Sequence, residues 1–112
     1  MDKPLQEIVN ELKKRNIRPS YQRLKILEYL MKERYHPTVE DIYFDLLKKI
    51  PTLSKSTIYN TLNLFIEKKL IKEVSMSKMI GVNEYGNIHF FYMLNFNRIV
   101  PLMRRLIIDW LP

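Results

Sequence analysis

The sequence predicts a mainly α-helical fold with one small β hairpin, arranged as a winged helix-turn-helix. Apolar residues recur at helical spacing through the first two thirds of the chain, and the pattern changes to alternation near residue 70. Prolines and hydroxyl-bearing residues divide the helical region into four segments. A chain of 112 residues has room for one domain around one hydrophobic core.

The first two predicted helices are separated by Pro19, which does not allow a helix to continue smoothly. Ser20 follows as an N-cap, because its hydroxyl can accept a hydrogen bond from an amide of the first turn. The apolar stripe of the first helix consists of Leu5, Ile8, Val9 and Leu12. That of the second helix consists of Leu24, Leu27, Leu30 and Met31.

The third helix is predicted to begin at Thr38, which has Asp41 three residues later and therefore resembles a capping box. The residues Tyr-His-Pro at 35–37 break the chain before it, and Pro51 marks its end. The side chains that this helix is expected to bury are Val39, Ile42, Tyr43, Leu46 and Leu47.

The fourth predicted helix is capped by Ser54 and runs to about residue 68. Because a helix has 3.6 residues per turn, its side chains divide into two faces. The apolar face carries Ile58, Leu62 and Phe65. The opposite face carries Lys55, Ser56, Tyr59, Asn60 and Asn63. One face is suited to a core, and the other can touch a polar partner.

A strand is predicted from Leu70, where residues 70–76 alternate between two faces. Residues 79–84 are the expected hairpin partner, with turn residues at Ser77 and Lys78. Three helices, a fourth helix and a short hairpin follow the order of a winged helix-turn-helix. In that arrangement the third helix and the turn after it present the fourth helix to the major groove of DNA.

Charge and composition narrow the classes of function. The chain has 19 Lys and Arg residues against 12 Asp and Glu residues, which gives a formal net charge of +7. A positive net charge is common among proteins that bind the phosphate backbone of nucleic acids. It has no cysteine, which excludes disulfides, thiolate zinc sites and cysteine nucleophiles. With two glycines, no phosphate-binding loop and no nucleophile beside a base, an enzyme is not expected.

The sequence predicts a cytoplasmic protein without a membrane segment. The residues 1–14 lack the apolar stretch of a secretory signal. The apolar region 88–111 is interrupted by charged residues and by Pro101, whereas a spanning helix needs about 20 mostly apolar residues.

Several polar side chains are suited to DNA. Lys55 can neutralise a phosphate, Tyr59 can pack on a sugar or a thymine methyl, and Asn60 can pair with an adenine edge. Arg18 and Arg23 flank a helix N-terminus, which already favours anions. The alternative is a solvated helix face with an ordinary serine cap and two surface arginines.

Four stretches of the sequence resemble the ferric uptake regulator family, and especially its peroxide-sensing repressors. They are NIRPSYQR at 16–23, YHPTVEDIY at 35–43, LSKSTIYNTL at 53–62 and LIKEV at 70–74. The resemblance implies the DNA-binding domain of a metal-responsive transcriptional repressor whose partner is double-stranded DNA. Together with the residue chemistry, it gives a set of expected DNA contacts: Arg18, Ser20, Gln22, Arg23, Ser54, Lys55, Ser56, Thr57, Tyr59 and Asn60.

The resemblance also implies metal chemistry, from which this sequence departs. Members of the family commonly hold a structural zinc with two Cys-x-x-Cys pairs in a second domain, but Met93 and Phe96 stand where the first pair would fall. His36 matches the first histidine of the regulatory site for iron, manganese or zinc. A closed site would need His36, His89 and a carboxylate such as Glu84. The alternative is that His36 packs beside Pro37.

Two interpretations of function follow. In the first, residues 1–86 form a DNA-binding winged helix of a repressor with an impaired metal response, and 87–112 are a remnant of the dimerisation and metal-binding domain or an apolar tail. Lys69 is then a departure at a position where the family often has glycine. In the second, the chain is an interaction protein that pairs with a full-length relative and modulates it. A homodimer or such a heterodimer is the expected assembly.

Overall fold

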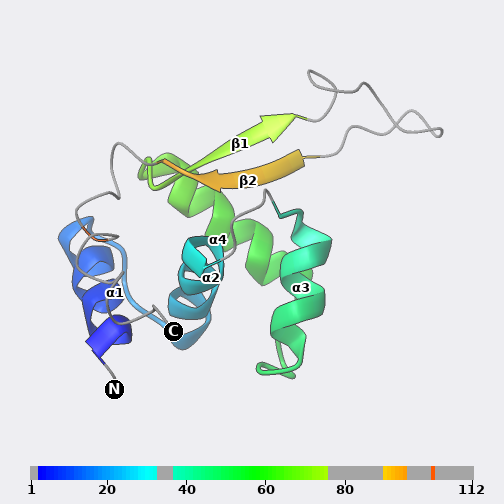
Figure 1. The fold of residues 1–112 in the computed structure, drawn as a ribbon, viewed down its shortest axis with the longest axis horizontal. Coiled ribbons are helices and arrows are strands. Elements are labelled where there is room, and N and C mark those ends of the chain that lie inside the picture. The colour runs from blue at the N-terminus through cyan, green and yellow to red at the C-terminus, as the bar shows by residue number, and fades with distance from the viewer. Residues whose placement is uncertain (1–2, 33–36, 76–89, 96–101, 103–112) are drawn as a thin grey trace.

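A computed structural model of the chain describes residues 3–32, 37–75, 90–95 and Leu102. The elements formed within these residues are four helices and a two-stranded antiparallel sheet, so the predicted fold class is confirmed. The elements are α1 (Lys3–Lys14), α2 (Tyr21–Lys32), α3 (Val39–Leu47), α4 (Lys55–Glu67), β1 (Ile71–Ser75) and β2 (Phe90–Leu94). In Figure 1 the sheet lies across one end of the helices, and α1 and α3 lie on opposite sides of α2 and α4.

The predicted start signals of three helices are present. The Ser20 hydroxyl accepts a hydrogen bond from the Arg23 amide at 3.2 Å. Thr38 and Asp41 form the expected capping box, in which each side chain accepts a hydrogen bond from the backbone amide of the other residue. Ser54 caps α4 through the Thr57 amide at 3.1 Å. Such caps satisfy amides that have no partner inside the helix.

The helices α1 and α4 end in the same type of turn. Asn16 and Lys69 have positive φ angles of 61° and 62°. In α4 the Leu70 amide donates to the Phe65 carbonyl at 2.9 Å, and the Lys69 amide donates to the Ile66 carbonyl at 3.0 Å. This is the Schellman pattern, which usually has glycine at the left-handed position. The left-handed turn that ends α4 is therefore formed at Lys69 without a glycine.

The hydrophobic core is formed by one face of α1, α3 and α4 and by most of α2. Ile58, Leu62 and Phe65 of α4 are fully buried, as the helical pattern predicts. On α2, Ile26 and Tyr29 are buried in addition to the four predicted positions. This second buried face follows from the central place of α2, which packs against α1, α3, α4 and β2.

The wing corrects one sequence prediction. The expected hairpin partner of β1 was the segment 79–84, but the partner in the structure is Phe90–Leu94. Pairing β1 with this later strand places Ile71 opposite Leu94, and both are buried. Tyr92 on the same strand is also buried, at 3% exposure. The residues 79–84 lie outside the described part of the chain.

The two strands of the sheet lie on either side of residue 86 in the sequence, where a domain boundary was predicted. The Asn95 amide also donates a hydrogen bond to the Leu70 carbonyl at 2.8 Å. Tyr92, Leu94 and Leu102 belong to the same core cluster as the helices. We therefore propose that the winged-helix domain extends through β2. Of the residues after Asn95, only Leu102 is described.

Candidate nucleic-acid interface

The approach to α2 and the exposed side of α4 meet in a shallow hollow of about 390 Å³. The side chains that line it are Arg18, Ser20, Gln22, Arg23, Thr57, Asn60 and Thr61. Six of these seven are residues that the sequence predicts to contact DNA. The structure therefore brings together candidates that lie about 40 positions apart in the sequence. The hollow is lined by two arginines and by hydroxyl and amide groups, without a carboxylate.

The start of α2 is held in shape by Arg23. Its Nη1 atom donates a hydrogen bond to the Arg18 carbonyl oxygen at 2.8 Å, and its backbone amide is capped by Ser20. Arg23 is only partly exposed, whereas Arg18 is exposed. The two arginines thus differ: Arg23 positions the backbone that carries Arg18, and Arg18 presents its guanidinium to solvent. An exposed guanidinium beside a helix N-terminus suits a phosphate.

The first turn of α4 combines capping with exposure. The hydroxyls of Ser54 and Thr57 lie 3.0 Å apart, and Ser54 also accepts from the Thr57 amide. These two predicted contacts therefore stabilise the helix start. Ser56, Asn60 and Asn63 are exposed along the same helix, and Tyr59 retains 44% of its exposure. A row of exposed amide, hydroxyl and aromatic groups can read base edges in a groove.

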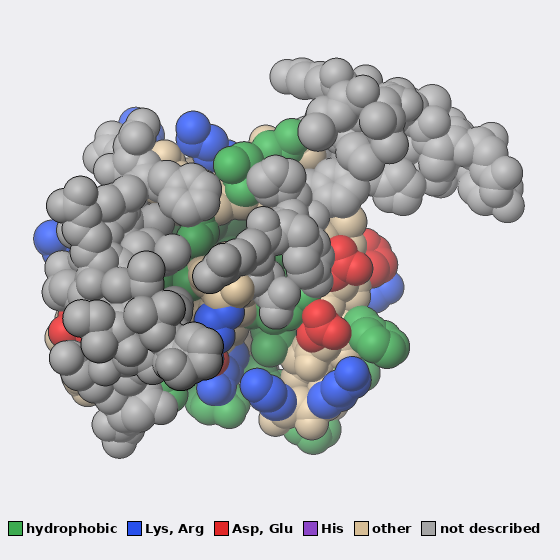
Figure 2. All heavy atoms as spheres, viewed as in Figure 1, with side chains coloured by type: hydrophobic (Ala, Val, Ile, Leu, Met, Phe, Trp, Pro, Cys, Tyr) green, Lys and Arg blue, Asp and Glu red, His purple; other side chains and the backbone are tan. Residues whose placement is uncertain are grey.

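Lys55 lies on the opposite flank of α4, away from this hollow. Its Nζ atom is 3.9 Å from Glu40 Oε1 and 5.5 Å from the centroid of the Tyr43 ring. It lines a second hollow of about 510 Å³ with Glu40, Asp41, Tyr43, Phe44 and Asp45. Figure 2 shows acidic side chains gathered over α3. The two flanks of α4 therefore differ in charge.

Tyr92 belongs to β2 of the wing and lies beside the chain just before α3. It is 3% exposed, and its backbone amide donates to the Pro37 carbonyl at 2.9 Å. Burial raises the pKa of Tyr92 to about 12, and the charge of Glu73, the neighbouring Tyr59, a hydrogen bond with Glu73 and the charge of Glu40 act in the same direction. The hydroxyl is therefore neutral at physiological pH, beside two carboxylates on the α3 and wing side.

The predicted metal ligands His36, Glu84 and His89 all lie outside the described residues. Within the parts of the chain that the structure describes, no group of three or more His, Asp or Glu side chains is placed to hold a metal ion. The same parts contain no helix long and apolar enough to cross a membrane.

Sequence reasoning missed three residues of the site. Thr61 lines the first hollow although it is only 4% exposed. Glu40 of α3 forms an ion pair with Lys55 of α4. Tyr92 belongs to a strand that was not predicted. Its signal was the run FFYML at 90–94, whose aromatic residues favour a strand. The pairing of Glu40 has no local signal, because the two residues are 15 positions apart.

The fold and the exposed face of α4 define a winged helix-turn-helix protein. Residues 14–110 match the family model of the "Ferric uptake regulator family". The chain belongs to that family.

Curated relatives and solved structures agree with this assignment. The chain is 44% identical over 71 residues to the peroxide operon regulator of Bacillus subtilis, covering 63% of this chain and 49% of the relative. It is 34% identical over 92 residues to the peroxide-responsive repressor PerR of Staphylococcus epidermidis, covering 80% of this chain and 61% of the relative. The chain thus spans about half to three fifths of the length of these relatives.

The fold matches PerR from Streptococcus pyogenes with a TM-score of 0.65 at 23% identity, over 81% of this chain and 56% of that one. It matches the ferric uptake regulator from Pseudomonas aeruginosa, solved with manganese, with a TM-score of 0.62 at 23% identity, over 77% and 58%. At these identities the likeness concerns the fold.

Proposed function

We propose that the chain is a DNA-binding transcriptional regulator of the ferric uptake and peroxide-response type, acting as a repressor with α4 in the major groove. The observation that carries this proposal is the hollow between the start of α2 and α4. It combines the exposed guanidinium of Arg18 with the amide of Asn60 and has no carboxylate in its lining. Membership of the family and the names of the curated relatives support the same function.

The proposed mode of binding divides the work between two groups of side chains. Arg18 and the N-terminal turn of α2 hold a backbone phosphate, which fixes the position of the domain on the duplex. Ser56, Tyr59 and Asn60 then face the bases, where an asparagine amide can pair with both hydrogen-bonding groups of adenine. Ser54, Thr57 and Arg23 act mainly by keeping these elements in place, because their groups bond within the protein.

A metal response depends on which ligands the sequence offers. A zinc site of four cysteines does not fit these 112 residues, because they contain no cysteine. A regulatory iron, manganese or zinc ion would be held by His36, His89 and Glu84, which offer two imidazole nitrogens and one carboxylate. With so few ligands we propose weak binding and an impaired response. Manganese is named for the Pseudomonas aeruginosa structure, and it is a property of that protein alone.

Assembly follows from the geometry of helix-turn-helix recognition, in which two copies read the halves of a palindrome. We propose a homodimer, or a heterodimer with a full-length relative, as the species with sequence preference. A single domain would bind mainly through phosphates, and its affinity would fall steeply with salt.

The test is fluorescence anisotropy with two labelled duplexes, one carrying the inverted repeat of the family and one scrambled. Binding is followed across salt concentrations, with and without iron, manganese or zinc. We expect binding to both duplexes at low salt and a preference for the repeat that does not require metal. Absence of binding at low salt contradicts the proposal. A mixture with a full-length relative, in which DNA binding decreases, favours the modulating role instead.

A further inference from the structure

The pair formed by Glu40 and Lys55 has a consequence for DNA recognition. Lys55 is the first residue of α4, where the positive end of the helix dipole disfavours a cation. Its neighbours compensate: Glu40 Oε1 lies 3.9 Å from Nζ, and the Tyr43 ring lies below it at 5.5 Å. The ammonium thus lies beside α3, and half of the side chain is exposed.

Glu40 differs from the other two carboxylates of the second hollow in its partners. Asp41 is engaged in the capping box of α3, and Asp45 accepts a hydrogen bond from the Tyr29 hydroxyl at 2.7 Å. The charged partner of Glu40 is Lys55, which belongs to the proposed recognition helix. Glu40 is also well exposed, at 64%, so its charge meets any anion that approaches this flank.

We propose that Glu40 is a specificity-determining residue, which holds Lys55 away from DNA phosphates and thereby suppresses sequence-independent binding. This inference rests on the proposed function. Sequence-independent affinity comes almost entirely from cations that replace counterions on the phosphates. A lysine that is already paired with a carboxylate neutralises DNA phosphates less, and it therefore releases fewer counterions from the DNA. Base contacts through Asn60, on the other flank, do not depend on the pair, so the ratio of specific to sequence-independent affinity rises.

The inference is tested with Glu40→Gln, which removes the charge and keeps the size of the side chain. The matched control is Glu67→Gln, which changes the net charge equally at the exposed C-terminal end of α4, about 18 Å along the helix from Lys55. Anisotropy with the scrambled duplex gives the slope of log K against log salt. Far-UV circular dichroism confirms that each variant folds.

We expect Glu40→Gln to strengthen binding to the scrambled duplex roughly three- to tenfold at low salt and to steepen the slope by about 0.9. The gain for the inverted-repeat duplex is expected to be smaller. Glu67→Gln is expected to change the slope little. In the background of Lys55→Gln, the effect of Glu40→Gln should largely disappear.

Four results overturn the inference. Equal effects of Glu40→Gln and Glu67→Gln would mean that net charge alone matters. A full effect of Glu40→Gln without Lys55 would mean that the pair is not its origin. If the wild-type chain binds neither duplex, the proposed function fails and the inference fails with it. If the wild-type chain binds DNA and Glu40→Gln leaves that binding unchanged, the inference alone fails.

Discussion

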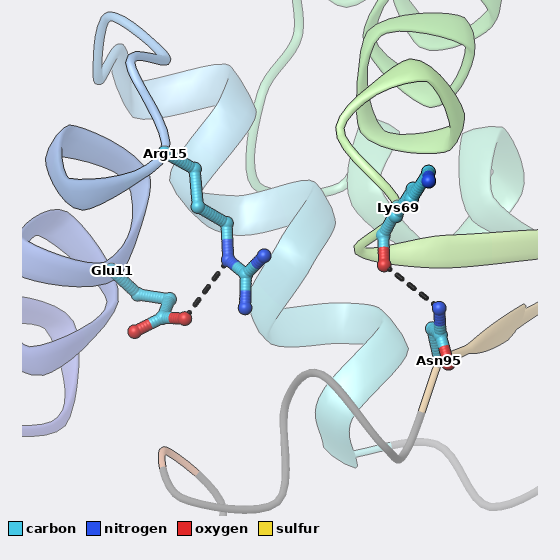
Figure 3. Close-up of polar contacts among 4 residues, drawn as sticks. All are labelled: Glu11, Arg15, Lys69 and Asn95. Carbon is cyan, nitrogen blue, oxygen red and sulfur yellow. Dashed lines mark hydrogen bonds and ion pairs between the residues drawn. The ribbon is translucent and has the colours of Figure 1, made fainter.

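The side-chain amide of Asn95 donates a hydrogen bond to the main-chain carbonyl of Lys69 at 3.0 Å (Figure 3). The backbone amide of Asn95 also donates to the Leu70 carbonyl at 2.8 Å. Asn95 follows β2, and Lys69 is the left-handed residue that ends α4. The end of the wing is therefore fixed to the end of the proposed recognition helix.

Replacing Asn95 with alanine should lower the free energy of unfolding by about 1 kcal/mol, because one net hydrogen bond is lost. Chemical denaturation measures the change as a shift of the midpoint. Asn63→Ala is the control, since Asn63 is an exposed residue within α4 and alanine favours a helix there. Equal destabilisation by both changes would contradict a structural role for the contact.

Replacing Lys69 with glycine should raise the free energy of unfolding by roughly 1 kcal/mol, because glycine adopts positive φ without the clash of a Cβ atom. Lys68→Gly provides the comparison, since Lys68 has a φ of −84° and gains nothing from glycine. Thermal and chemical denaturation should rank Lys69→Gly above the wild type and Lys68→Gly below it. A loss of stability in Lys69→Gly would show that the turn is not strained.

The raised pKa of Tyr92 predicts that the folded protein loses stability in alkaline solution. Its pKa is raised from 10.0 to about 12 in the folded state, so folding favours the protonated hydroxyl. The contribution is complete below pH 10, where both states are protonated, and is lost as the pH rises from about 10 to about 12. Two pKa units correspond to on the order of 2 to 3 kcal/mol.

The measurement is the free energy of unfolding of Tyr92→Phe and the wild type between pH 8 and about pH 12. Other tyrosines and lysines titrate in the same range, so the difference between the two proteins is the relevant quantity. We expect the wild type to lose more stability than Tyr92→Phe as the pH rises. Parallel curves would show that Tyr92 does not titrate in this way.

The helices were predictable because their determinants are local. Ser54 and Thr38 act as caps, and the stripe of Ile58, Leu62 and Phe65 is buried as its spacing indicates. Six of the seven residues that line the first hollow were predicted, although their assembly depends on how α2 packs against α4. Local signals of this kind are strong in helices, where each residue interacts with neighbours three and four positions away.

The features that were not predicted depend on contacts between distant residues. Strand β2 pairs with β1 across an intervening segment, and no turn signal beside β1 indicates that register. Glu11 is buried at 5% exposure, and its carboxylate lies 2.9 Å from Nε of Arg15, one turn later on the same helix (Figure 3). Its burial depends on the surrounding elements and not on the residue type, which favours the surface.

The central claim, that the hollow between α2 and α4 binds a DNA phosphate, is tested most directly by the salt dependence of DNA binding in Arg18→Ala. Lys49→Ala is the control, because it removes an equal charge from an exposed site beyond the end of α3, outside both hollows. We expect Arg18→Ala to weaken binding to both duplexes and to flatten the slope of log K against log salt by about 0.9, whereas Lys49→Ala leaves the slope nearly unchanged. Equal slopes for Arg18→Ala and the wild type would contradict the claim.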